Sequence, residues 1–134
     1  MRIERLDHLV LTVRDLEASV AFYRDLLGME EIEFGDGRRA LGFGPHKINL
    51  HPIVSDINPR AAQPVAGSGD LCLVIQGSIK ALISELDAQG VRIELGPVRR
   101  TGALGPLVSL YLRDPDENLV ELSSYEPEDR ELLY

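Results

Sequence analysis

Three side chains able to bind metals or move protons interrupt apolar stretches of this 134-residue chain. His8 and His51 each lie in a short apolar run, and Glu121 lies between Val120 and Leu122. Burying such a group is costly unless it is paired, hydrogen-bonded or bound to a metal. Taken singly, each residue has a simpler interpretation, as a satisfied core histidine or a glutamate that faces solvent. Their matched positions in the repeat described below make them candidates for one site.

Two further candidates, Tyr111 and Ser109, fall on one face of a predicted strand. If that face lines the site, the phenol can donate a hydrogen bond to a substrate oxyanion. The alternative is an aromatic residue where strands favour one. Arg99 and Arg100 open a loop, where paired guanidinium groups can hold an anionic substrate or can simply be solvated.

The elements that must position these residues begin with a strand over 6–13, in which side chains alternate between two faces. A helix follows, with Asp15 as its N-cap and Gly28 as its C-terminal stop. Three short extended segments come next, at 29–35, 38–43 and 47–54. The first half of the chain therefore has the pattern βαβββ.

The pattern then repeats after a Pro-, Ala- and Gly-rich connector over 57–69. A strand over 70–76 precedes a helix from Ser78 to Gly90. Extended segments follow near 91–95, 107–113 and 118–124. The two helix starts are 63 residues apart, so an internal duplication explains the chain better than any single motif.

Composition excludes several classes of function. The formal net charge of −8 disfavours nucleic acid as a partner, because a polyanion is repelled on average. The single cysteine, Cys72, excludes an internal disulfide and is expected to be a small buried hydrophobe. No apolar run is long enough to cross a membrane, and the N-terminus has no signal-peptide core. A cytoplasmic protein is the expectation.

Three stretches of the sequence carry a resemblance to a known family. The opening stretch over 6–16, Phe22-Tyr23 before Leu27-Gly28, and the closing stretch over 114–122 resemble the vicinal oxygen chelate superfamily. This superfamily includes glyoxalase I, fosfomycin- and bleomycin-resistance proteins and extradiol dioxygenases. The resemblance covers about residues 4–125. It implies an α+β fold of two tandem βαβββ modules that form a curved sheet around a cup.

The resemblance also implies a metal site, because the family draws its ligands from the first and last strands of each module. The matched positions are His8 and His51 in the first module and Leu71 and Glu121 in the second. Leu71 cannot ligate, so His8, His51 and Glu121 are the expected ligands. They would leave open positions on Fe, Mn, Zn or Ni for a substrate.

The expected function is a metal-dependent enzyme that chelates two neighbouring oxygens of a small molecule for lyase or isomerase chemistry, with Glu121 and Tyr111 as catalytic residues. Tyr111, Ser109 and Arg100 are the expected substrate-binding residues. The alternatives are an extradiol-type ring-cleaving dioxygenase and a metal-free binding protein like those for bleomycin resistance. We expect one domain over 1–134, with modules at about 4–56 and 70–125 and a tail over 126–134, and a homodimer.

Overall fold

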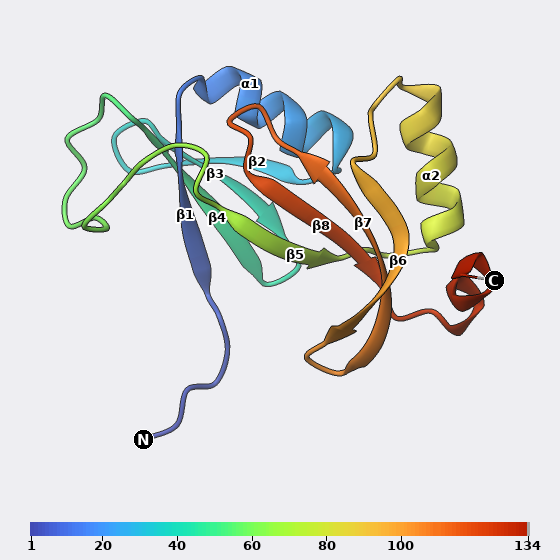
Figure 1. Cartoon of the computed structure of the whole chain (residues 1–134). Coiled ribbons are helices and arrows are strands. Elements are labelled where there is room, and N and C mark those ends of the chain that lie inside the picture. The colour runs from blue at the N-terminus through green and yellow to red at the C-terminus, as the bar shows by residue number, and fades with distance from the viewer. Residues whose placement is uncertain (134) are drawn as a thin grey trace. The chain divides into compact units, whose positions relative to one another are not determined.

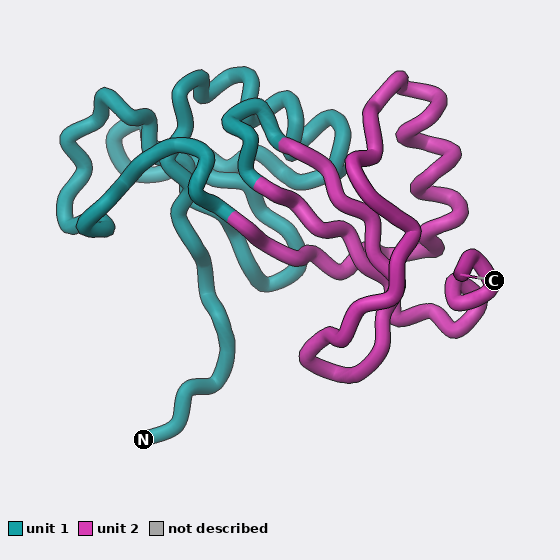
Figure 2. The backbone as a smooth tube through the Cα atoms, viewed as in Figure 1, with its two compact units in different colours: residues 1–69, 114–118 teal, residues 70–113, 119–134 magenta. Residues whose placement is uncertain are grey.

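The computed structural model describes residues 1–133 and divides into two compact units. The first comprises residues 1–69 and 114–118, and the second comprises residues 70–113 and 119–134 (Figure 2). The predicted connector ends where the first unit gives way to the second. That the whole chain acts as one domain stays a prediction.

Each unit contains one four-stranded sheet (Figure 1). The strands of sheet one lie side by side in the order β1 (His8–Val13), β4 (His46–Pro52), β3 (Arg38–Phe43) and β2 (Glu30–Phe34). Those of sheet two lie in the order β5 (Asp70–Val74), β8 (Leu119–Ser124), β7 (Gly105–Arg113) and β6 (Leu95–Gly102). In both sheets the first strand pairs in parallel with the last, and the other pairs are antiparallel. The prediction of an α+β fold with tandem βαβββ modules is confirmed.

The helices begin where the sequence predicts. The Asp15 carboxylate accepts the backbone N–H of Ala18 at the start of α1 (Leu16–Val20), and Ser78 caps α2 (Ile79–Ala88) in the same way. The first helix is not a uniform α-helix, because a π-helical stretch occupies Ala21–Leu26. Both helices are followed by the predicted glycines at positive φ, as a left-handed stop requires.

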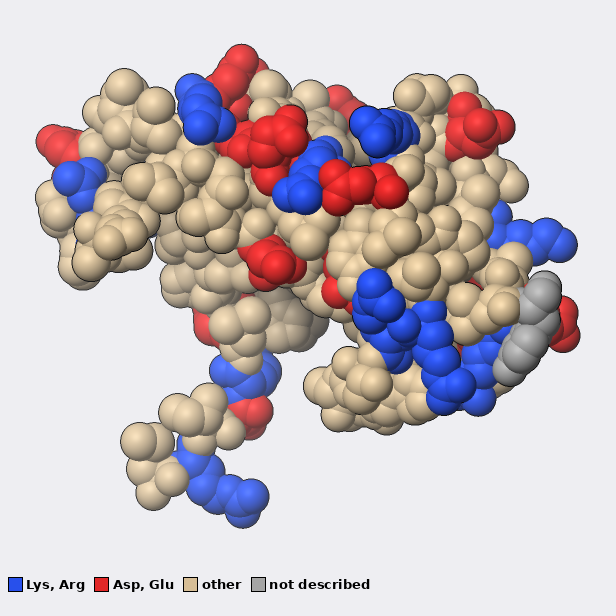
Figure 3. Space-filling view, in the orientation of Figure 1, with Lys and Arg blue, Asp and Glu red and all other residues tan. Residues whose placement is uncertain are grey.

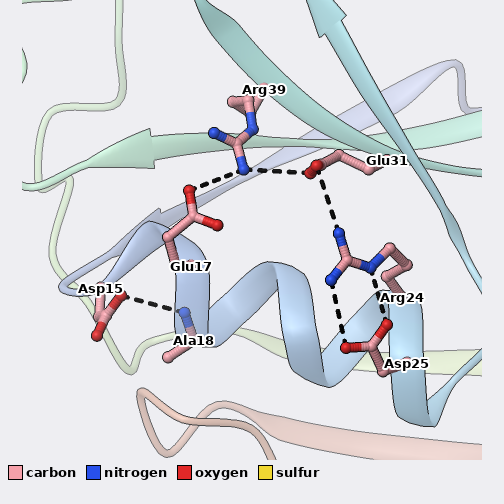
Figure 4. A network of polar contacts seen from close by, with 7 residues as sticks. All are labelled: Asp15, Glu17, Ala18, Arg24, Asp25, Glu31 and Arg39. Carbon is pink, nitrogen blue, oxygen red and sulfur yellow. Dashed lines mark hydrogen bonds and ion pairs between the residues drawn. The ribbon is translucent and has the colours of Figure 1, made fainter.

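Helix α1 is tied to one face of sheet one by charged side chains (Figure 4). Arg39 on β3 bonds to Glu17 on the helix at 2.9 Å and to Glu31 on β2 at 3.1 Å. Arg39 pairs with Leu50 of β4, so Leu50 shares this helix-facing side. The apolar side chains on the same side of the sheet are buried, namely Leu11, Val13, Leu41, Ile48 and Leu50.

Two expectations for the second half need correction. The strand predicted near 91–95 begins only at Leu95. Arg99 and Arg100, expected to open a loop, lie instead within this strand, β6, which forms a long hairpin with β7 and a turn at 103–104. The tail over 126–134, whose mainly acidic composition is typical of a frayed terminus, contains a 3-10 helix over Pro127–Leu133. Its Asp129 is buried, and both carboxylate oxygens accept the Ile79 backbone N–H at 3.0 Å. Tertiary contact with α2 therefore orders a segment whose composition is typical of a loose terminus.

Within residues 1–133, no helix has the length and apolar character that a membrane span needs.

Candidate functional site

Every predicted site residue on a strand projects from the side of its sheet opposite the helix. We call this side the helix-distal face. On sheet one it carries His8 on β1 and Asn49 and His51 on β4, because these residues alternate with the buried helix-facing leucines and valines. On sheet two it carries Glu121 on β8 and Tyr111 on β7, which are paired in register.

The two histidines of sheet one are not brought together. His8 pairs with Lys47, whereas His51 pairs with Thr12, four positions further along the same two strands. At about 3.3 Å per residue, their backbones are roughly 13 Å apart along the strand direction. The two imidazoles therefore have separate surroundings.

His8 is partly exposed, and its Nδ1 lies 2.8 Å from a carboxylate oxygen of Asp7. A carboxylate on one imidazole nitrogen orients the ring and favours the other nitrogen as a metal ligand. His8 therefore has the support that metal-binding histidines commonly have.

His51 is 7% exposed, and its Nε2 lies 3.1 Å from a guanidinium nitrogen of Arg38. Burial, together with the positive charges of Arg38 and Arg60, lowers the pKa of His51 below its usual 6.5. The ring is therefore neutral at pH 7, and its Nε2 accepts from Arg38, which can only donate. A metal would need the lone pair of that nitrogen, which already accepts the hydrogen bond from Arg38. His51 therefore fits a ligand role less well than His8.

On sheet two, Glu121 is held by two hydroxyl groups. Ser109 donates to Oε2 of Glu121 at 2.7 Å, and Ser123 donates to the same oxygen at 3.3 Å. The two hydroxyls also lie 2.7 Å apart, and both serines are fully buried. With no exposed surface, Ser109 holds Glu121 instead of presenting its own hydroxyl to a substrate. The expected substrate-binding role for Ser109 therefore becomes a positioning role in this structure.

The structure brings Tyr111 and Arg100 into contact. The Nε–H of Arg100 donates to the Tyr111 hydroxyl oxygen at 2.9 Å, and the guanidinium carbon lies 5.5 Å from the ring centroid. Because the hydroxyl accepts from Arg100, its own proton remains available for a substrate oxygen. Arg100 lies on β6, where Figure 3 shows Lys and Arg side chains grouped beside the β6–β7 hairpin.

The register of sheet two corrects the expected place of Leu71. Leu71 pairs with Val120 and shares its helix-facing side, whereas Cys72 pairs with Glu121. Cys72 is exposed, not a buried hydrophobe, and its sulfur lies 3.1 Å from the Ser123 hydroxyl. Although the residue is exposed, its sulfur is partly desolvated, and this desolvation raises the pKa of the Cys72 thiol. The negative charge of Glu121 raises it further. The thiol is therefore protonated at neutral pH and is a poor nucleophile.

The same register reveals a site residue that the sequence analysis missed. Val10 pairs with Asn49 in sheet one, and Cys72, 62 positions after Val10, pairs with Glu121 in sheet two. Asn49 is therefore the counterpart of Glu121. It is 5% exposed, and its buried side-chain oxygen has no hydrogen-bond partner among the described residues. A buried amide oxygen without a protein partner is costly unless it accepts from water or binds an ion.

By the same correspondence, Asp70 is the counterpart of His8, since these residues are also 62 positions apart and begin β5 and β1. The sequence alone does not give these assignments. They require matching the last strands 72 positions apart, whereas matching His51 to Glu121 uses 70, and only the register decides between the two.

No three His, Cys, Asp or Glu side chains are grouped so as to hold a metal ion in the part of the chain that the structure describes. The donors that fit a metal best on their own surroundings are His8, oriented by Asp7, and Glu121, held by two serines. The unpartnered oxygen of Asn49 is a third.

The chain was compared with known proteins. The family model described as "Glyoxalase/Bleomycin resistance protein/Dioxygenase superfamily" matches residues 5–122. The chain is 48% identical to "Glyoxalase domain-containing protein RDO1" of Mycosarcoma maydis, over 94% of this chain and 71% of that protein. It is 46% identical to "Virulence protein STM3117" of Salmonella typhimurium, over 93% of this chain and 87% of that protein. The crystal structure of the latter superimposes with a TM-score of 0.91. "Methylmalonyl-CoA epimerase, mitochondrial" of Mus musculus is 31% identical, over 90% of this chain and 73% of that protein.

Proposed function

The chain belongs to the glyoxalase/bleomycin resistance protein/dioxygenase superfamily, and we propose that within it the chain is a divalent-metal-dependent enzyme for lyase or isomerase chemistry. Its substrate is a small molecule with two neighbouring oxygens. One observation carries the proposal: Glu121 is fixed by Ser109 and pairs in register with Tyr111. A carboxylate and a phenol side by side supply a proton acceptor and a proton donor.

The residues divide the work as follows. Ser109 and Ser123 both bond to Oε2 of Glu121, so Oε1 is the oxygen left to bind a metal or to accept a proton. Tyr111, whose oxygen accepts from Arg100, donates its proton to a substrate oxygen that becomes negatively charged. Arg100 adds a positive charge beside that oxygen. Such groups act best when they are held in place before the reaction begins.

We retain His8 and Glu121 as proposed metal ligands. Within each unit, a second donor lies at the corresponding position of the repeat: Asn49 in the first unit and Asp70 in the second. A divalent ion held by these groups would act as a Lewis acid that polarises the substrate oxygens. A set with one imidazole and several oxygens favours manganese among the four metals considered from the sequence. His51 is not included among these ligands, because Arg38 already bonds to its Nε2. The metal-content test below includes a His51 variant to check this.

The relatives support this class of reaction in general terms. The mouse relative is named an epimerase, and an epimerase moves a proton at a carbon centre. A proton acceptor and a proton donor on neighbouring strands are what such a reaction needs. We also propose, from the sequence alone, a homodimer that works in the cytoplasm.

A second candidate is a metal-free protein that binds a small molecule. The observation that favours it is the engagement of His51 by Arg38 at 3.1 Å, an arrangement that suits ligand binding better than metal binding. The ring-cleaving dioxygenase has no such support, since His8 and His51 lie four register positions apart.

Metal content of the purified protein tests the proposal. We expect near-stoichiometric divalent metal in the wild type after reconstitution. His8→Ala and Glu121→Ala should lose it, and Asn49→Ala and Asp70→Ala should bind it more weakly. Cys72→Ser and His51→Ala are the matched controls, expected to retain metal. If the wild type takes up none of Mn, Fe, Zn or Ni, the enzyme proposal fails and the metal-free candidate replaces it.

A further inference from the structure

The helix-distal face of sheet one carries a cluster of cations that the proposed chemistry does not use. Arg38 and Lys47 both lie against the ring of Phe34, with the guanidinium carbon 4.8 Å and the ammonium nitrogen 3.9 Å from its centroid. Arg38 lies on β3 and Lys47 on β4, so the two side chains converge on Phe34 from different strands. Each contact is a favourable cation–π interaction, and together they hold two positive charges beside one ring.

Neither cation is neutralised by an ion pair within residues 1–133. Glu17 and Glu31 pair with Arg39 on the helix-facing side, and Glu31 also pairs with Arg24 of the helix. Asp7 is near enough to Lys47 for their charges to interact, but it bonds to His8. Glu30 lies on the same face, across β3 from Lys47. In a chain with a net charge of −8, unpaired cations grouped in this way are notable.

Arg38 is also held in one orientation. Its guanidinium stacks on Phe34 and spends one N–H on Nε2 of His51, which is nearly buried. A planar guanidinium carries five N–H donors, so a fork of donors remains for a second acceptor. A carboxylate or phosphate matches that fork with two parallel hydrogen bonds.

The His51 ring itself is in contact with a positive charge, because Arg38 bonds to its Nε2 at 3.1 Å. The neutral imidazole of His51 can donate from its other nitrogen. The surroundings of His51 are therefore electropositive, which opposes a metal cation and favours an anion.

We propose that Arg38, Lys47 and His51 form an oxyanion-binding site on the helix-distal face of sheet one, which takes the carboxylate or phosphate of a small molecule. Arg38 supplies two parallel hydrogen bonds, Lys47 supplies a point charge, and the Phe34 ring holds both cations in place. The site needs no metal, so it stands or falls separately from the proposed enzyme.

The test is titration of metal-free, full-length protein with inorganic phosphate and, in a second arm, with malonate, at constant ionic strength in chloride. The readout is the NMR signal of His51, one of only three histidines in the chain. We expect saturable shifts of this signal in at least one arm, and the arm with the tighter binding identifies phosphate or carboxylate. Arg38→Gln should weaken binding about tenfold or more, and Lys47→Gln about threefold, in line with the loss of a bidentate and a single charged contact.

Arg39→Gln is the matched control. Arg39 is the next residue in the chain, but it lies on the helix-facing side in ion pairs with Glu17 and Glu31. Its loss should change oxyanion binding less than twofold. Arg99→Gln, on sheet two, is a second control in case Arg39→Gln fails to fold. The proposal is overturned if neither anion shifts the His51 signal saturably, or if Arg38→Gln binds as the wild type does.

Discussion

Tyr23 and Asp114 are joined by a buried hydrogen bond of 2.7 Å between the phenol hydroxyl and a carboxylate oxygen, although 91 positions separate them in the chain. The carboxylate also accepts the backbone N–H groups of Asp116 and Asn118 and the amide of Asn118. Through this bond the turn between β7 and β8 becomes part of the first unit. Burial and the charge of Asp114 raise the pKa of Tyr23 far above its usual range, so the hydroxyl is always a donor.

Tyr23→Phe should lower the free energy of unfolding by about 1–2 kcal/mol, because it removes one donor from a buried carboxylate. Urea denaturation followed by circular dichroism measures this loss. Tyr125→Phe is the matched control, since the Tyr125 hydroxyl accepts from an exposed backbone N–H, that of Leu104. Equal stability of Tyr23→Phe and wild type would contradict the role given to this bond.

Ser109→Ala should loosen Glu121 without removing any group that touches substrate. We expect metal affinity to fall about 10- to 100-fold, as is typical when a residue that orients a ligand is lost. Calorimetric titration with the metal found in the wild type measures the affinity. Ser84→Ala, which removes a solvent-exposed hydroxyl on α2, should leave the affinity unchanged. Full affinity in Ser109→Ala would show that Glu121 needs no such support.

The lowered pKa of His51 predicts how stability depends on pH. The unfolded chain binds a proton at His51 near pH 6.5, whereas the folded protein resists it. The contribution of His51 to stability is therefore complete above that pH and is lost as pH falls below it toward the folded-state pKa. NMR titration should give a pKa below 6.5 for His51.

Two variants check the cause of this shift. Arg38→Gln should move the His51 pKa upward, because it removes a positive charge, whereas Arg39→Gln should leave it in place. A His51→Gln chain should lose less stability than wild type between pH 7.5 and 5. A His51 pKa above 6.5 in the wild type would contradict the surroundings described for this ring.

Asp129→Ala should destabilise the protein by about 1–2 kcal/mol, as the loss of a helix cap does, because the Ile79 N–H is then buried without a partner. Thermal and urea unfolding measure the effect. Glu131→Ala, an exposed change in the same 3-10 helix, should be close to neutral. If a chain that ends at residue 126 is as stable as the full chain, the tail has no such role.

Most of the fold could be predicted from local patterns. The caps at Asp15 and Ser78, the glycine stops and the alternation in β1 are short-range signals, and the structure agrees with them. The elements placed wrongly are those whose conformation depends on distant partners. The extent of β6 is set by its pairing with β7, and the tail is ordered by the bond from Asp129 to α2.

The candidate site was predictable only in part, for a similar reason. Alternation along one strand shows which side chains share a face, so Tyr111 with Ser109 and His8 with Thr12 follow from the sequence. The sequence does not show how far each strand is shifted along its neighbour. That shift makes Asn49, not His51, the counterpart of Glu121.

The sequence by itself therefore determined the tandem βαβββ pattern, its helix caps and the residues able to do chemistry, because these depend on side-chain type and on spacing within one element. Only the tertiary structure decided which of those residues meet. It placed His51 beside Arg38, Ser109 beneath Glu121, and Cys72 instead of Leu71 next to Glu121. Register between strands and contacts across long loops arise from packing of the whole sheet, and no local pattern in the chain encodes them.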